Sequence, residues 1–304
     1  MQWYENARAA VCLTGDIDAS KDIAEGRLGR MLDVLDDYKV RCTFPIVAQA
    51  LQEDPEIAEQ ITLRKHEIAG HGDVHREFRG QSYSEQKKRL KRMIEIMETI
   101  SGQRIKGFRA PFLAGDVTTI KAESNLGLLY DNTITTGQAR WFHLERKLSQ
   151  KNEIIRTLLK NLSKIKKMTK TPKIFYRLHP LFYVSGFESN DQPFHLNLNR
   201  KLAILLIPIS DLDDYHLIDV GPRYKDWRKV AEVWKRCLSH RYERNGLYVL
   251  SAHPLRIGTK KYVKALESFI EHAISKDDVW FATLTELAEW FNKSCFPIQK
   301  TFSE

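Results

Sequence analysis

The feature that most constrains the fold is a repeated alternation between short apolar runs and longer amphipathic segments. Short apolar runs are typical of buried strands, whereas the segments between them repeat apolar residues at helical spacing. The predicted strands are residues 9–14, 42–47, 66–70, 105–112, 128–132, 202–208, 246–254 and 279–283. The predicted helices are residues 22–38, 55–65, 84–100, 117–126, 224–241, 260–275 and 285–292. This order predicts right-handed βαβ units, a parallel sheet, and closure into a distorted (β/α) barrel of seven or eight strands.

The length and composition are those of one large globular domain. We expect the 304 residues to form a single barrel domain, with its core over about residues 9–292. No apolar run is long enough to cross a membrane, and residues 1–8 lack the apolar core of a secretory signal. The four cysteines are scattered and form no disulfide framework. These observations favour a cytoplasmic protein.

A basic segment interrupts the predicted barrel at residues 137–200. Between residues 140 and 177, twelve lysines and arginines stand against two glutamates, so the rest of the chain is close to neutral. Apolar residues recur at helical spacing within this stretch, which predicts an amphipathic helix on the surface. One interpretation packs this helix against the barrel. The other places it on an anionic membrane, at the inner face of the cell membrane. No binding motif accompanies the charge, so nucleic acid is not an expected partner.

Ionisable residues follow several of the predicted strands, where β/α barrels carry their chemistry. Asp16 and Asp18 follow the first strand, and the alternation with Ile17 puts both carboxylates on one side. His71 and His75 are four residues apart, a spacing at which two imidazoles can reach one metal ion. Arg109 and His253 end two further strands. One Asp and two His make a plausible three-ligand Zn²⁺ site, in which the ion activates water and polarises a carbonyl.

The motifs around these residues resemble those of the polysaccharide deacetylases of carbohydrate esterase family four. The stretch Thr14–Asp18 resembles the family's first motif, with one residue between its two acids, as in an atypical peptidoglycan-deacetylase-like branch. His66–His75, Arg109–Phe112 and Leu250–His253 are similar to three further motifs and occur in the family's order. The resemblance runs from about residue 9 to residue 290, apart from the basic segment. For the remaining motif, which tunes the catalytic histidine, Asp219 and the pair Asp226–Trp227 are both candidates.

The resemblance implies a role for each of these residues. Asp18, His71 and His75 would hold a divalent metal ion, most simply Zn²⁺. Asp16 would be the general base, kept charged by Arg109, and His253 would protonate the departing amine. The expected substrate pocket consists of Pro111, Phe112, Asp219, Trp227 and Leu250. Other interpretations stay open from the residues alone.

Those other interpretations are structural. Asp18 could be only a cap or turn residue. Asp16 could be only an ion-pair partner of Arg109, and His253 could be only a packed loop histidine. His66 is expected to be structural.

The function that follows is a metal-dependent hydrolase that removes the acetyl group from an N-acetylated sugar. Without an export signal, we expect an intracellular or lipid-linked precursor of a surface glycan as the substrate. The nearest enzymatic alternative is a related hydrolase of cyclic ureides or imides. A non-enzymatic alternative is a barrel that binds a membrane or an anionic polymer through its basic segment.

Overall fold

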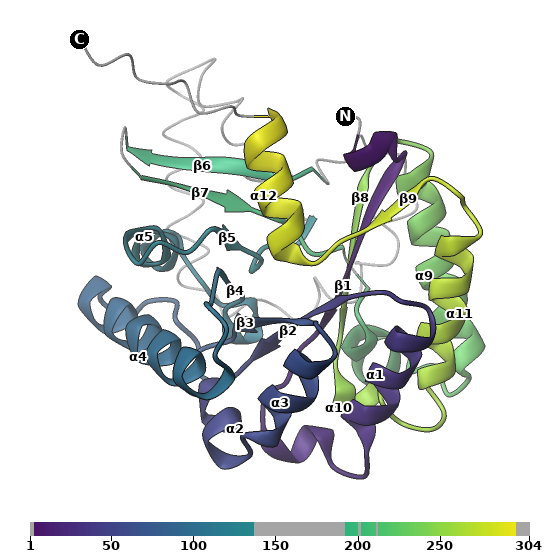
Figure 1. The fold of residues 1–304 in the computed structure, drawn as a ribbon, viewed down its shortest axis with the longest axis horizontal. Helices are drawn as coiled ribbons and strands as arrows, with labels where there is room; N and C mark the ends of the chain where they lie inside the picture. Colours follow the sequence, from purple (N-terminus) through teal and green to yellow (C-terminus); the bar gives the residue numbers. More distant parts are fainter. Residues whose placement is uncertain (1–2, 137–191, 200–201, 211, 296–304) are drawn as a thin grey trace.

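The computed structural model describes residues 3–136, 192–199, 202–210 and 212–295 (Figure 1). Most of the predicted basic segment, including all of residues 140–177, lies outside these ranges. Its predicted helix and its predicted membrane contact therefore stay predictions. Among the described residues, no helix is both long enough and apolar enough to span a bilayer.

The described strands form one sheet in which almost every pair is parallel, as the alternating pattern predicts. They are β1 (Ala9–Gly15), β2 (Cys42–Ile46), β3 (Glu67–Gly70), β4 (Gly107–Phe108), β5 (Tyr130–Asp131), β6 (Phe194–Asn199), β7 (Leu202–Leu206), β8 (Leu247–Ala252) and β9 (Val279–Phe281). Their order is β6-β7-β5-β4-β3-β2-β1-β8, and β9 pairs with the first residues of β1. The predicted α/β fold is confirmed.

Strand β6 differs from the prediction, because it lies within the stretch assigned to a surface insertion. It pairs antiparallel with β7, with a register shift between Asn197 and Asn199. Only two residues separate the end of β6 from the start of β7. So short a connection permits a hairpin but not a parallel crossover, which needs a dozen or more residues.

The sheet curls so that its two ends approach each other beyond the strand ladders. The chain that continues β7 reaches Ser210, whose backbone N–H donates to the Val249 carbonyl of β8 at 3.0 Å. The Ser210 hydroxyl accepts from the Val249 N–H, also at 3.0 Å. We call this junction between Ser210 and β8 the seam. It brings the chain that follows β7 next to β8.

Helices cover the outside of the curled sheet (Figure 1). They are α1 (Arg27–Asp37), α2 (Ala48–Glu53), α3 (Glu56–Leu63), α4 (Tyr83–Ser101), α5 (Val117–Asn125), α9 (Trp227–Tyr242), α10 (Pro254–Ile257), α11 (Val263–Ile274) and α12 (Leu284–Cys295). Short 3₁₀ turns occur at Tyr4–Asn6, Ser20–Ile23 and Pro111–Leu113, and a π-helical turn at His216–Val220. The sequence did not predict α2 or α10, each under two turns long and therefore without a readable helical period.

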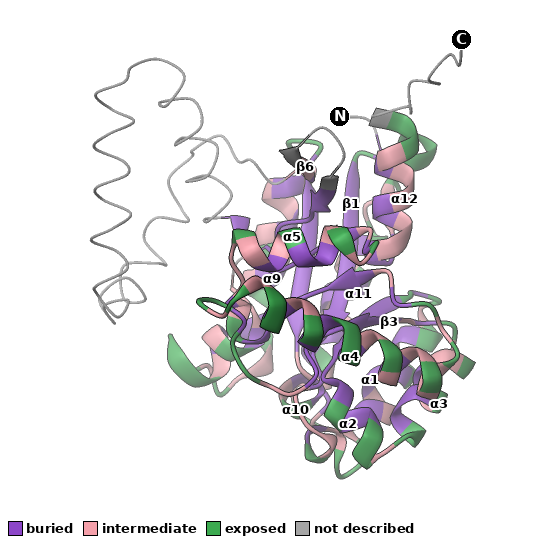
Figure 2. Ribbon diagram, turned by 90° about the vertical axis from the view of Figure 1, so that its left-hand side faces the viewer, coloured by how far each residue is buried: buried purple, intermediate pink, exposed green. Residues whose placement is uncertain are grey.

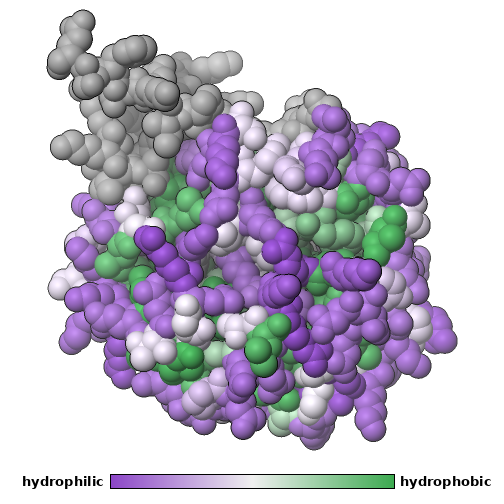
Figure 3. All heavy atoms as spheres, viewed as in Figure 1, coloured by the Kyte–Doolittle hydropathy of each residue, from purple (hydrophilic) through white to green (hydrophobic). Residues whose placement is uncertain are grey.

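The buried residues lie on the strands and on the inner faces of the helices, as Figure 2 shows. Every residue of β1 is buried, because the strand has neighbours on both edges and helices beyond. Hydrophilic side chains cover most of the face seen in Figure 3, with single hydrophobic residues between them. This packing makes the sheet a rigid support for the loops at its carboxyl end.

Candidate active site

The two acids after β1 are presented by an extension of the strand. Asp16 N–H donates to the Ala252 carbonyl of β8 at 2.8 Å. Ile17 exchanges backbone hydrogen bonds with the opposite side, donating to Pro45 at 2.9 Å and accepting from Val47 at 3.0 Å. Ile17 is fully buried in the core. Since side chains alternate along an extended chain, its neighbours Asp16 and Asp18 face the other way.

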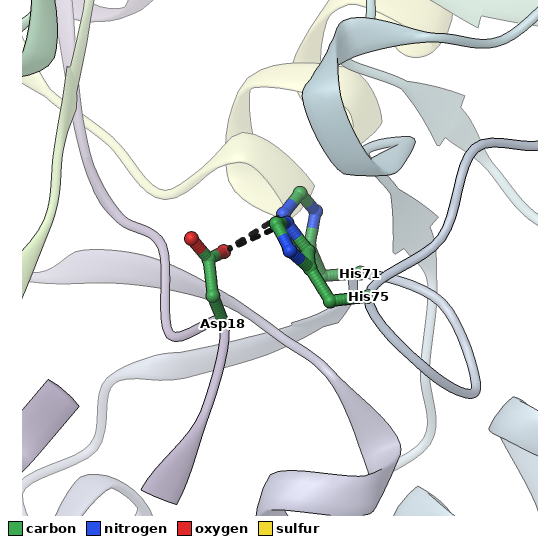
Figure 4. A group of neighbouring side chains, drawn as sticks. All are labelled: Asp18, His71 and His75. Carbon is green, nitrogen blue, oxygen red and sulfur yellow. Dashed lines mark ion pairs between the residues drawn. The ribbon is translucent and has the colours of Figure 1, made fainter. Parts of the chain in front are cut away.

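Asp18, His71 and His75 meet at one point above the sheet (Figure 4). The Nε2 atoms of both histidines lie 3.3 Å from Asp18 Oδ1. The three potential ligand atoms all lie within 4.8 Å of one another. The two rings come from residues after β3, in a stretch that is a loop rather than the helix that their spacing suggests. Gly72, with φ +94°, turns the chain so that both rings reach the same side.

The hydrogen bonding of His71 suits this cluster to a cation. Its Nδ1 lies 2.7 Å from the Arg109 carbonyl, and a carbonyl only accepts, so Nδ1 carries the proton of the neutral ring. Nε2 then presents a lone pair toward Asp18 Oδ1, a buried atom with no hydrogen-bond partner. Two acceptors facing each other are unfavourable unless a positive charge lies between them. An Asp and two imidazoles fit Zn²⁺ or a similar divalent ion, with a coordination position left open.

The surroundings of Asp18 also favour its charged form. Burial raises the pKa of Asp18, but positive charge on the neighbouring His71, His75 and His253 rings, when they carry it, lowers that pKa well below its usual range. Burial lowers the pKa of His75, although Asp18 opposes the shift. A deprotonated carboxylate and a neutral imidazole are the ligand forms that a metal ion requires.

A fully buried arginine links the strand ends. The Arg109 guanidinium donates to Asp16 Oδ1, to the Thr14 hydroxyl at 2.9 Å and to the Ser251 hydroxyl at 3.1 Å. Its other side donates to Asn132 Oδ1, and Asn132 Nδ2 donates to the Ile207 carbonyl at 2.6 Å. One cation thus contacts groups at the carboxyl ends of β1, β5 and β8, and its ion pair fixes the orientation of the Asp16 carboxylate.

His253 is held by an aspartate that the sequence analysis did not select. Its backbone N–H donates to Asp214 Oδ2 at 2.8 Å, and its Nδ1 lies 2.6 Å from Asp214 Oδ1. Burial lowers the pKa of His253, but the negative charge and hydrogen bond of Asp214, with Asp16 and Asp213 nearby, raise it to about 10. The ring is therefore a protonated, oriented acid at neutral pH.

The two sequence candidates for the partner of His253 are thereby corrected. Asp219 instead accepts from Arg256 Nε at 2.6 Å, and Asp226 caps α9 by accepting from the Arg228 N–H at 3.0 Å. Trp227 begins α9, packs against the core, and has the Arg228 guanidinium 4.8 Å above its ring. Neither carboxylate contacts His253 because each is committed to a nearby basic or backbone group.

The other predicted pocket residues have different environments. Leu250 is buried within β8, in the barrel core, and Pro111 is buried beside Gly72. Phe112 is 63% exposed, and its ring centroid lies 4.3 Å from that of His75. Of the three, only Phe112 therefore presents a ring to solvent next to the predicted metal ligands. Its positive φ of 56° is the kind of uncommon backbone geometry that gathers at functional sites.

His66 lies away from this cluster. It precedes β3, and its ring accepts from the Cys42 N–H at 3.2 Å. This position agrees with the structural role that the sequence suggested.

Three polar residues in or near the site were not selected from the sequence. Asp214 lies in an Asp-Asp-Tyr-His stretch outside any predicted strand, 39 residues from its partner His253. Asn132 ends a predicted strand, but its amide side chain carries no charge, and only ionisable residues at strand ends were selected. Arg89 is a buried arginine within an otherwise amphipathic helix, and its partners are visible only in three dimensions.

Comparison with known proteins finds, over part of the chain, a match to the family that the motifs resemble. Residues 5–130 match the family model of the polysaccharide deacetylases. A peptidoglycan deacetylase-like protein of Gibberella zeae is 30% identical over 132 residues. That match covers 42% of this chain and 39% of the relative, so the chain spans well under half of the relative's length.

Two of the solved structures with a similar fold cover 95% and 96% of this chain. A Mycobacterium smegmatis protein described as a polysaccharide deacetylase has a TM-score of 0.71 at 23% identity, covering 95% of this chain and 92% of that one. The Puue allantoinase has a TM-score of 0.70 at 16% identity, covering 96% and 93%. At these identities the likeness concerns the fold.

Proposed function

We propose that this chain, whose residues 5–130 match the polysaccharide deacetylase family model, is a metal-dependent hydrolase that removes the acetyl group from an N-acetylated sugar. The observation that carries the proposal is the gathering of three kinds of group at one end of the sheet. These are the cluster of Asp18, His71 and His75, the carboxylate of Asp16, and the protonated ring of His253. Amide hydrolysis needs an electrophilic centre, a base and an acid.

Asp18, His71 and His75 would hold the divalent ion, which when bound polarises the acetamide carbonyl and makes a water molecule more acidic. Asp16 is the carboxylate placed to accept a proton from the attacking water. Its ion pair with Arg109 keeps one oxygen occupied and leaves the other to act as base.

His253 is the group placed to deliver a proton to the sugar nitrogen. Water adds its oxygen to the acetyl carbon, the carbon–nitrogen bond breaks, and the amine leaves with the proton from His253. Asp214 supports this role because it holds the ring in one orientation and favours its protonated form. Without that proton the leaving group would be an amide anion, which is far too basic to depart.

A second candidate function is the hydrolysis of a cyclic ureide or imide. The allantoinase of similar fold supports it, and ring opening also cleaves a carbon–nitrogen bond next to a carbonyl. Phe112 favours the sugar, because an exposed aromatic ring beside the site offers the flat apolar surface on which a sugar ring packs. Acetate release from N-acetylated sugars and ring opening of ureides, assayed side by side, separate the two candidates.

The finer parts of the hypothesis concern the glycan and the metal. A lipid-linked or intracellular precursor of a surface glycan, and contact of residues 140–177 with an anionic membrane, stay predictions. Comparing acetate release from a lipid-linked and a water-soluble N-acetyl saccharide tests the first, and vesicle binding at low and high salt tests the second. Zn²⁺ is the metal we propose, and reconstitution of chelated protein with Zn²⁺, Co²⁺ or Mg²⁺ tests it.

The deciding experiment measures bound metal and acetate release in the same protein preparations. We expect about one divalent ion per chain in the wild type, its loss in His71→Ala, and its retention in His272→Ala, a control histidine on α11 that contacts Ser239. Asp16→Asn should keep the ion and lose turnover. Absence of metal from the wild type, even after addition of Zn²⁺, would overturn the proposal, and full activity in Asp16→Asn would remove Asp16 from the mechanism.

A further inference from the structure

The predicted metal ligand His75 lies in a loop that has no strand or helix to hold it. Residues 71–79 follow β3 without regular secondary structure. His71 has its own support, because its N–H donates to the Ile46 carbonyl of β2 at 2.9 Å and its ring contacts the Arg109 carbonyl. His75 is four residues farther on and has neither contact. Another part of the molecule must hold the loop in place.

That part is Arg89, a residue of α4 that is only 3% exposed. Its Nε–H donates to Asp73 Oδ1 at 2.8 Å, so the buried guanidinium has a buried counter-charge. The remaining donors reach the Glu77 carbonyl at 2.9 Å, Gln81 Oε1 at 3.2 Å, the Arg76 carbonyl at 3.1 Å and the Val74 carbonyl at 3.4 Å. A guanidinium has five N–H groups, and here four have an acceptor in the loop and the fifth has Gln81, just beyond it.

The packing around this guanidinium is also specific to arginine. Its carbon lies 3.9 Å from the centre of the Phe78 ring, which itself belongs to the loop. A planar cation can stack on the ring and donate in five directions at once, whereas a lysine ammonium offers three donors on a flexible stem. The Arg89 side chain therefore fixes the loop as a unit.

Two of the five acceptors flank His75 directly. Val74 and Arg76 are its neighbours in the chain, and both of their carbonyls accept from Arg89 Nη2. The Val74 carbonyl also accepts from the Arg76 N–H at 2.8 Å, which closes a tight turn centred on His75. With both adjoining residues held, the direction in which the His75 side chain leaves the backbone is set before any ion arrives.

We propose that Arg89 is a positioning residue that pre-orients His75 for the metal ion, an inference that rests on the proposed metal site. It does not touch the ion or the substrate, and it acts through the loop backbone. Groups that orient metal ligands typically change metal affinity by about tenfold to a hundredfold when they are removed. We expect a loss of this size for Arg89→Lys, which keeps the charge but not the five directed donors.

The first experiment follows the loop without metal, so its result does not depend on the proposed function. Hydrogen–deuterium exchange of the chelated protein should speed up over residues 72–81 in Arg89→Lys. The matched control is Arg92→Lys, an exposed arginine on the same helix, which should leave the exchange unchanged. Equal exchange in the wild type and Arg89→Lys would show that Arg89 does not hold the loop, and would overturn the proposal. If Arg89→Lys fails to fold, Asp73→Asn removes the counter-charge instead and should speed the same amides.

The second experiment measures Zn²⁺ affinity by competition with a chelator in a double-mutant cycle. Arg89→Lys should weaken binding in the wild-type background but cause no further loss in the His75→Ala background, because its effect runs through His75. Equal losses in both backgrounds would show a general structural effect and overturn the proposal. A wild type that binds no Zn²⁺ would overturn the metal site and this inference together, whatever the exchange data show.

Discussion

A buried histidine away from the active site should make the stability of the fold depend on pH in a calculable way. The His66 side chain is almost fully buried, and its Nδ1 accepts from the Cys42 N–H. The proton of the neutral ring is therefore on Nε2, a buried atom that makes no hydrogen bond. Burial lowers the pKa of His66 to about 4, although Asp36, 3.9 Å from Nε2, opposes the shift.

The sign and size of the effect follow from this pKa. In the unfolded chain His66 has a pKa near its ordinary value of about 6.5, so between pH 6.5 and 4 the unfolded state binds the proton and the native state does not. The stabilising contribution is complete above pH 6.5 and is lost as the pH falls toward 4. A difference of roughly 2.5 pKa units at about 1.4 kcal/mol each gives about 3.5 kcal/mol in full, of which about 3 kcal/mol is lost by pH 4. This is a large part of the roughly 5–15 kcal/mol typical of a folded domain.

The measurement is urea unfolding of chelated protein, followed by tryptophan fluorescence between pH 8 and pH 4. The comparison variant is His66→Asn, whose amide oxygen can accept from the Cys42 N–H but which does not titrate. Other groups contribute equally to both proteins, so we compare their difference. From pH 8 to pH 4 the wild type should lose about 3 kcal/mol more free energy of unfolding than His66→Asn. Two parallel curves would refute the reasoning.

Three further substitutions test the site and the sheet below it. Asp214→Asn removes the charge that raises the pKa of His253. The alkaline limb of the pH–rate profile should therefore move to lower pH, and turnover should fall by about 10²–10⁴. Unchanged turnover would remove the pair of Asp214 and His253 from the mechanism. Phe112→Ala should raise KM about twofold to tenfold, the equivalent of roughly 0.5–1.5 kcal/mol for an aromatic contact, and an equal loss in kcat at constant KM would contradict a binding role. Gly107→Ala would place a methyl carbon 1.9 Å from the Tyr130 ring, so unfolding experiments should show a loss of about 1–3 kcal/mol, and wild-type stability would show that the ring can move.

The fold was predictable because the pattern of apolar residues in the sequence indicates which segments are buried and whether they have the period of a strand or of a helix. β1 is apolar at almost every position, as a strand covered on both faces must be, and α4 repeats its apolar residues over five turns. Short elements carry no such pattern. Strands β4 and β5 have two residues each and are defined by their hydrogen-bonded neighbours, and β6 is defined by its hairpin with β7.

The candidate site was predictable where its residues follow strands and carry charge. Asp18 and His71 satisfy both conditions, and the structure brings them together with His75. The supporting residues Asp214, Asn132 and Arg89 each satisfy only one of these conditions. Asp214 follows Leu212, a residue with φ +70°, so it comes after an irregular stretch rather than a strand. Nothing local distinguishes Asp214 from Asp219, because only the three-dimensional path decides which carboxylate meets His253.

The pairing of Asp214 with His253 also contributes to the seam. Asp214 belongs to the chain that continues β7, whereas His253 ends β8, so their two hydrogen bonds cross the same junction as those of Ser210 and Val249. The hydrogen bond between Asp214 and His253 orients the proposed acid and also helps to hold the two ends of the sheet together. The pKa of His253 is therefore coupled to the closure of the sheet. A motion that separated the two ends of the sheet would break the contact of His253 with Asp214 and lower the pKa of His253.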